Sequence, residues 1–184
     1  IIIGDVDRPL VIKVASISSA RIQVYFIDNE DYFRRKQIAR DADGKFFEDN
    51  GQRAIFFARG VLETVKKLRW APDVIHCQGW ISQLVPIYLK KAYNGDPIFS
   101  GSKIVTSLYG EIADERFSPS FKDNILFGGI THADVSQLDT PTGINLAKIA
   151  AMYSDGVVFG DKDVDPELVK FCQDVSPDYS PEEY

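Results

Sequence analysis

The chain has 184 residues, of which 45% are apolar and 26% charged, and this size and composition are typical of one globular domain and exclude a disordered or collagen-like chain. The excess of acidic over basic residues, 27 against 21, gives a net charge of −6, which disfavours nucleic acid as a partner. No apolar run reaches the ~18 residues of a membrane span, and we expect Cys77 and Cys172, which lie in unrelated contexts, to be free thiols in a reducing compartment.

The beginning of the chain predicts a β-hairpin. The first residues, Ile1 to Ile3, are apolar and include no initiator methionine, so we expect the natural protein to begin upstream. Residues 9–17 and 21–27 are rich in β-branched and aromatic side chains, and the short segment 18–20 between them predicts a turn. Asp28-Asn29 then ends the second strand and can cap a helix or a turn that begins at Glu30.

The middle of the chain alternates helices and strands. Apolar residues recur at steps of three and four over residues 52–70, which predicts a helix with Asp49-Asn50 as capping candidates. A short apolar strand is predicted at 74–77, a second helix at 81–93 and another strand at 103–108. This alternation indicates a parallel sheet with right-handed crossovers.

The last part of the chain continues the same alternation. A helix is predicted at 144–153, a strand at 156–159, and a helix at 166–175 with Asp165 as its N-cap. Residues 121–130 are a weaker helical candidate in a poorly patterned region.

Two loops at the predicted strand ends are the candidate site. Gln78-Gly79-Trp80 and Tyr109-Gly110-Glu111 each combine a glycine, an aromatic ring and hydrogen-bonding groups, and open α/β sheets bind ligands beyond the carboxyl ends of their strands. An aromatic face beside polar donors suits a sugar ring. The alternative is structural: Trp80 covers the top of a helix and Gly79 makes the turn.

Other chemistry-bearing residues favour ordinary structural roles. We interpret His76 as a hydrogen-bonded core residue and His132 as a solvated loop residue. Glu48-Asp49 beside Arg53 is interpreted as a cap and a surface ion pair. Two dispersed histidines and two cysteines form no zinc pattern, and no glycine-rich phosphate-binding motif is present.

Longer motifs resemble a known family. VYFIDNEDYFRR (24–35), the stretch 48–80 that ends WAPDVIHCQGW, LVPIYLKKAY (84–93) and KIVTSLYG (103–110) follow one another at the family's spacing. Together they closely resemble bacterial glycogen synthases and plant starch synthases. Beyond residue 110, we favour YSDGVVFGD (153–161) over GGITHAD (128–134) as the counterpart of the family's next strand.

The resemblance implies a retaining glucosyltransferase of the GT-B type, built from two Rossmann-like domains. Residues 1–175 would be its N-terminal starch-synthase-like domain, incomplete at the N-terminus, and 176–184 an acidic, proline-containing tail or linker. The implied fold is α/β, with a Rossmann-like parallel sheet, helices on both faces and the N-terminal hairpin. The implied partners are an α-glucan, ADP-glucose or UDP-glucose, and a C-terminal domain of the same protein, in the cytoplasm, with no cofactor, metal, nucleic acid or membrane.

Departures from the family motif lie at the site itself. The family's H-x-H-D-W-H occupies residues 76–81, with Ile81 in place of a histidine that contacts the donor glucose, and its H-N pair is replaced by Tyr109-Gly110. We therefore assign no catalytic residue and give four sugar- or glucan-binding candidates: His76, Gln78, Trp80 and Tyr109. The alternatives are a non-catalytic glucan-binding or regulatory module, and an unrelated flavodoxin-like binding domain; the 184-residue chain alone is expected to be inactive.

Overall fold

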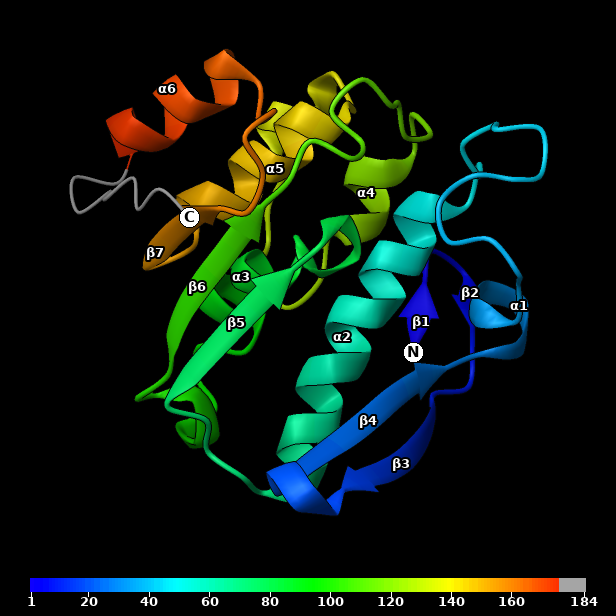
Figure 1. Cartoon of the computed structure of the whole chain (residues 1–184), viewed down its shortest axis with the longest axis vertical. Helices are drawn as coiled ribbons and strands as arrows, with labels where there is room; N and C mark the ends of the chain where they lie inside the picture. Colours follow the sequence, from blue (N-terminus) through cyan, green and yellow to red (C-terminus); the bar gives the residue numbers. More distant parts are fainter. Residues whose placement is uncertain (176–184) are drawn as a thin grey trace.

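The computed structural model describes residues 1–175, so the predicted linker at 176–184 lies outside the described residues. The chain runs through strands at its start, a long helix, and then alternating strands and helices (Figure 1). The helices and strands are β1 Ile2–Ile3, β2 Val6–Asp7, β3 Val11–Ile17, β4 Ile22–Asp28, α1 Glu30–Phe33, α2 Asn50–Leu68, β5 Val74–Gln78, α3 Val85–Ile87, β6 Lys103–Leu108, α4 Phe121–Ile125, α5 Gly143–Met152, β7 Gly156–Phe159 and α6 Pro166–Val175. No helix within residues 1–175 is long and apolar enough to cross a bilayer.

The predicted parallel sheet is confirmed. It has three strands in the order β5-β6-β7, with His76 opposite Val105 and Thr106 opposite Val157. The strand at 156–159 is β7, whereas 128–134 forms turns, which agrees with the favoured counterpart of the family strand. The Asp165 carboxylate accepts a hydrogen bond from the Glu167 N–H at 2.8 Å, so the predicted cap of α6 is also present.

The N-terminal hairpin is confirmed as well. Strands β3 and β4 pair antiparallel from Val11 opposite Asp28 to Ile17 opposite Ile22, and a 3₁₀ turn connects them. The Asn29 side chain then accepts hydrogen bonds from the first backbone N–H groups of α1, as the capping signal predicts.

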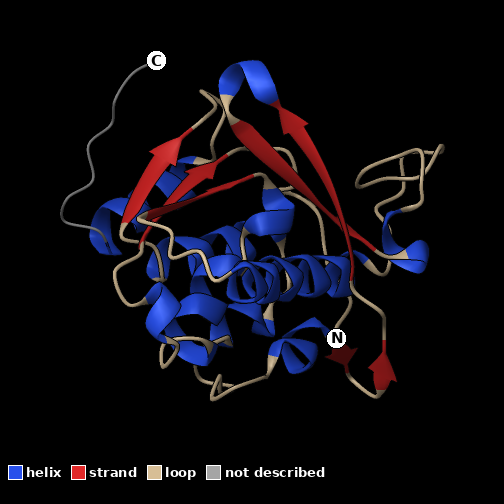
Figure 2. Ribbon diagram, turned by 90° about the horizontal axis from the view of Figure 1, so that it is seen from below, coloured by secondary structure: helices blue, strands red, loops and turns tan. Residues whose placement is uncertain are grey.

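The helices gather beneath the strands on one side, as Figure 2 shows. On the opposite side of β5, Val74 is 59% exposed and His76 and Gln78 are also exposed. Within the part of the chain that is described, the expected helices on both faces are therefore found on one face only.

The helix predicted at 81–93 is interrupted. The chain instead forms a 3₁₀ turn at Trp80–Ser82, the short helix α3, and a π-helical segment at Tyr88–Ala92. Two local features account for the interruption: Ser82 Oγ donates to backbone carbonyls of the preceding turn, and Pro86 has no N–H with which to continue the helical ladder.

The helical candidate at 121–130 is shorter than predicted. Helix α4 ends at Ile125. Gly128 and Gly129 follow with φ angles of 58° and 97°, a left-handed conformation that glycine adopts without strain and that cannot continue a right-handed helix. The remaining residues of this region form turns.

A buried arginine holds the loop at residues 34–49 (the 34–49 loop) against α2. Arg53 is 4% exposed, and its Nε donates to the Tyr32 carbonyl at 2.8 Å. One terminal nitrogen donates to the Ile38 carbonyl and to Asn50 Oδ1, both at 2.6 Å, and Asn50 Nδ2 donates to the Ala39 carbonyl at 2.8 Å. The interpretation of Arg53 as a surface ion-pair partner is therefore wrong, because the side chain is buried and its acceptors are two backbone carbonyls and a side-chain amide.

The expected side-chain cap of α2 is also absent. Asp49 occupies the N-cap position, but its carboxylate makes no capping hydrogen bond. It accepts instead from Arg35, whose terminal nitrogen lies 2.8 Å from Asp49 Oδ1. Both capping candidates, Asp49 and Asn50, thus hold the 34–49 loop rather than the free N–H groups of the helix.

The two cysteines are free, as the sequence predicts, and both are buried. Cys77 lies on the helix side of β5, opposite Thr106. Burial raises the pKa of the Cys77 thiol to about 12, against a smaller opposing effect of a hydrogen bond with Thr106, and burial raises the pKa of Cys172 to about 11.

We predict that Arg53→Met lowers the free energy of unfolding by roughly 2–3 kcal/mol, because two buried acceptors and one part-buried acceptor lose their donor, at a cost of about 1 kcal/mol each. The matched control is Lys67→Met on the exposed side of the same helix, which should change stability by less than about 0.5 kcal/mol. Urea unfolding of both variants tests this expectation. Equal stabilities of the two variants would contradict it.

We also predict that neither thiol reacts with a thiol reagent at about pH 8 while the chain is folded, because only the thiolate is nucleophilic and both pKa values lie well above that pH. Urea should expose both to rapid labelling. Mass spectrometry of the labelled chain distinguishes the sites, and labelling of Cys77 at the unfolded rate in native buffer would show the prediction to be wrong.

Candidate functional site

The two predicted loops meet at the carboxyl ends of neighbouring strands. Gln78 at the end of β5 lies opposite Ser107 of β6, so the turn at Trp80 and the loop that begins at Tyr109 start side by side. The Trp80 backbone N–H donates to a carboxylate oxygen of Glu111 at 2.9 Å. This hydrogen bond joins the loops directly.

Two of the predicted site residues share the open face of the sheet. His76 Nε2 lies 2.8 Å from Ser107 Oγ, and Gln78 Nε2 lies 3.5 Å from His76 Nδ1. His76 is exposed, so its interpretation as a core residue is wrong although its ring is hydrogen-bonded. The physical reason is the alternation of β5, which directs Cys77 inward and its two neighbours outward.

Trp80 occupies a different environment from the one expected of a sugar platform. Trp80 is 4% exposed, and its ring centroid lies 6.1 Å from that of Phe46 and 6.4 Å from that of Phe117. Gly79 has a φ of 77° and makes the preceding turn. The stacking face expected at Trp80 is thus covered by other aromatic rings, as in the structural alternative, and only its backbone contributes to the strand-end surface.

Tyr109 is half-buried and directly follows the last residue of β6. A Cβ atom at Gly160 would come within 2.3 Å of its ring, so the ring packs directly on the backbone that follows β7. The structure therefore brings together His76, Gln78 and Ser107, and places the Tyr109 ring against the backbone of Gly160.

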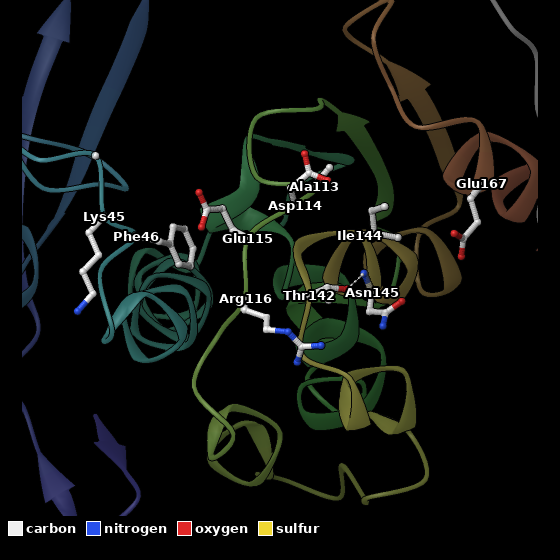
Figure 3. Close-up of a pocket in the computed structure, with 11 residues that line it drawn as sticks. Lys45, Phe46, Ala113, Asp114, Glu115, Arg116, Thr142, Ile144, Asn145 and Glu167 are labelled. Atoms are coloured by element: carbon white, nitrogen blue, oxygen red, sulfur yellow. Dashed lines mark hydrogen bonds between the residues drawn. The ribbon is translucent and has the colours of Figure 1, made fainter.

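A hollow of about 800 Å³ opens beside these loops (Figure 3). We call it the loop cavity; it lies between the 34–49 loop, the segment after β6, and the start of α5. Its lining residues are Gly44, Lys45, Phe46, Ala113, Asp114, Glu115, Arg116, Thr142, Ile144, Asn145 and Glu167. The sequence analysis missed it, because two of its sides come from loops without a regular pattern and the other from the first turns of α5 and α6, which lie far from those loops in the chain.

Glu115 connects the three sides of the loop cavity. Its carboxylate accepts from Arg40 Nε at 2.8 Å, and its backbone carbonyl accepts from the Gly143 N–H at 2.9 Å. A Cβ atom at Gly143 would come 1.8 Å from the Ile112 carbonyl oxygen, so this contact requires glycine. The position of the loops is consequently fixed at the backbone level.

A metal site is not formed by the described residues. No group of three histidine, cysteine or carboxylate side chains in residues 1–175 is placed to hold an ion. His132 Nδ1 lies 3.6 Å from Asp123, and both side chains are well exposed, in agreement with the interpretation of His132 as a solvated loop residue.

Comparisons with known proteins give a consistent picture. A family model described as "starch synthase catalytic domain" matches residues 3–172. The chain is 31% identical to a glycogen synthase of Chlorobium limicola over 173 residues, covering 84% of this chain and 33% of the relative. It is 41% identical to a glycogen synthase of Chlorobium luteolum over 143 residues, covering 67% of this chain and 29% of the relative.

A solved structure is similar to this fold. It is the catalytic domain of starch synthase IV from Arabidopsis thaliana bound to ADP and acarbose, with a TM-score of 0.63 and 16% identity over 85% of this chain and 31% of that chain. This chain thus spans about a third of the length of the relatives it matches.

We predict that Glu111→Ala accelerates hydrogen exchange of the Trp80 amide at least tenfold, because a hydrogen bond to a charged acceptor contributes about 1.5 kcal/mol or more. Glu48→Ala removes an exposed carboxylate from another loop and should leave this amide unchanged. Exchange rates measured by NMR for both variants test this, and equal rates would show that Glu111 does not hold the turn.

Proposed function

Because this chain belongs to the starch synthase catalytic domain family, we propose that it forms the acceptor-side half of a retaining enzyme that transfers glucose from ADP-glucose or UDP-glucose to an α-1,4-glucan. The observation that carries this proposal is the family match, which extends over nearly the whole described chain. The related fold that is bound to ADP and acarbose supports a nucleotide sugar and a glucan as the ligands.

The strand-end surface has groups suited to a polyhydroxyl ligand. His76, Gln78 and Ser107 present neutral donors and acceptors within hydrogen-bonding distance of one another, and sugar hydroxyls both donate and accept. Half-buried Tyr109 adds a partly accessible ring. We propose that these groups orient the glucan, that no metal takes part, and that the enzyme acts in the cytoplasm.

The second side of the active cleft would come from another domain of the same protein. Transfer requires donor and acceptor in a near-attack geometry, which contributes roughly 7–11 kcal/mol in favourable cases. One domain can bind the acceptor but cannot supply this positioning alone. We therefore propose that this chain binds the acceptor, and that glucose transfer requires the longer protein.

A second candidate function rests on the altered motif. Ile81 is half-buried, packs against the core and has no side-chain hydrogen-bonding group at a position where the family motif has histidine. Loss of one positioned donor costs on the order of 3 kcal/mol of transition-state stabilisation. A glucan-binding or regulatory module without transfer activity is therefore the alternative.

We predict that the 184-residue chain incorporates no labelled glucose from ADP-glucose or UDP-glucose into glucan above a no-protein control. The physical reason is the missing second side of the cleft. Incorporation above that control would contradict the assignment of the chain as one half of the enzyme.

The protein expressed from its full reading frame distinguishes the two candidate functions. The enzyme proposal predicts transfer with at least one of the two sugar nucleotides, and Ile81→His serves as the gain-of-function comparison. Glucan binding without transfer in both proteins would favour the regulatory module, whereas turnover within about tenfold of an ordinary synthase would exclude it.

A further inference from the structure

The segment after β7 holds the backbone on both sides of Tyr109. On one side, the Gly160 N–H donates to the Leu108 carbonyl at 2.9 Å, which continues the pairing of β6 with β7 beyond the last strand residues. On the other side, a Cβ atom at Gly110 would lie 3.1 Å from the Asp163 carbonyl oxygen, so the two backbones are in close contact there. Tyr109 is therefore fixed at its backbone by contacts with another loop.

The Tyr109 ring is fixed as well, because its outer edge lies on the Gly160 backbone. A Cβ atom at Gly160 would come 2.5 Å from Tyr109 Cζ and 2.8 Å from its Oη, which is closer than such atoms approach in proteins. The φ angle of Gly160 is not positive, so its backbone conformation is open to any residue. What this position requires of glycine is the space for the ring.

The Tyr109 hydroxyl is available to a ligand. It makes no hydrogen bond with any residue in the range 1–175, and it is accessible to solvent. A phenol hydroxyl both donates and accepts hydrogen bonds, as sugar hydroxyls do. Because the ring is held before a ligand arrives, less conformational freedom is lost when the hydroxyl binds.

We infer that Gly160 is a positioning residue for the proposed glucan-binding surface: it leaves room for the Tyr109 ring and so places the Tyr109 hydroxyl where it binds a glucan hydroxyl. This inference rests on the proposed function. Tyr109 lies two residues after Ser107, which contacts His76, so the placed hydroxyl extends the same row of polar groups. Tyr109 also replaces a residue of the family's H-N pair, and its contact with Gly160 is therefore particular to this chain.

Alanine at position 160 is the substitution that tests this inference. The atoms that its Cβ would meet belong to the far end of the Tyr109 side chain, so we expect the ring to rotate away while the fold is kept. The matched control is Gly156→Ala at the beginning of β7. A Cβ atom there would lie 3.8 Å from Val105 Cγ2, an ordinary van der Waals distance that displaces nothing.

Calorimetric titration of the 184-residue chain with maltoheptaose measures the effect. Tyr109→Ala and Gly160→Ala should each weaken binding about tenfold, the combined scale of one hydrogen bond and one aromatic contact. The double variant should bind no more weakly than Tyr109→Ala, because both changes act through one ring. Tyr109→Phe keeps the ring and should weaken binding about threefold, and Gly156→Ala should leave the affinity unchanged.

NMR of chains with labelled tyrosine rings separates positioning from a general structural effect. The Tyr109 ring signals, assigned by their loss in Tyr109→Phe, should shift in Gly160→Ala and stay in place in Gly156→Ala. Urea unfolding verifies that each variant is folded. If Gly160→Ala unfolds the chain, the double variant with Tyr109→Ala should restore the fold, since the obstructing ring is gone, and failure to restore it would overturn the inference.

The outcomes distinguish this inference from the proposed function. If Tyr109→Ala weakens maltoheptaose binding while Gly160→Ala does not, or if the two effects add in the double variant, Gly160 does not act through the ring; the inference is then wrong and the proposed function stands. Ring signals that stay in place in Gly160→Ala have the same consequence. If the unsubstituted chain binds no maltoheptaose, both the inference and the proposed function fail.

Discussion

The buried guanidinium of Arg53 is the contact on which the candidate site depends. Burial lowers its pKa, but an arginine stays charged in proteins, so the cost of burying that charge must be offset by hydrogen bonds. The acceptors are carbonyls of Tyr32 and Ile38 and the side chain of Asn50. These bonds place the 34–49 loop on α2, and with it Phe46 and one side of the loop cavity.

An aromatic cluster connects the 34–49 loop to the loops at the strand ends. Phe46 contacts both Trp80 and Phe117, and Phe117 stacks on Phe121 with ring centroids 4.5 Å apart. Aromatic pairs of this kind contribute about 0.5–1.5 kcal/mol beyond the area they bury. The loop, the β5 turn and the segment after β6 are therefore packed as one unit, and the polar groups around them are held in position before any ligand arrives.

Successive side chains of β5 point to opposite faces of the sheet, and the two faces therefore differ in burial. Cys77 faces the helices and is inert because burial raises its pKa, whereas His76 and Gln78 face away from them and remain accessible. A strand that is covered on one face only can combine a packed core with a polar surface. This arrangement leaves the predicted binding groups at the carboxyl end of a sheet strand, where α/β folds place their ligands.

Local signals in the sequence determined the hairpin, the strands at β5, β6 and β7, and α6, because side-chain periodicity and capping act over a few residues. The long ordered motifs likewise determined the family, which leaves an unrelated flavodoxin-like domain without support. Only the tertiary structure decided that Trp80 is covered, that Arg53 is buried and that the 34–49 loop, the segment after β6 and the start of α5 border an open hollow. Each of these depends on contacts between residues far apart in the chain, such as Arg40 with Glu115. Contacts of this kind produce no periodic pattern in the sequence from which they could be predicted.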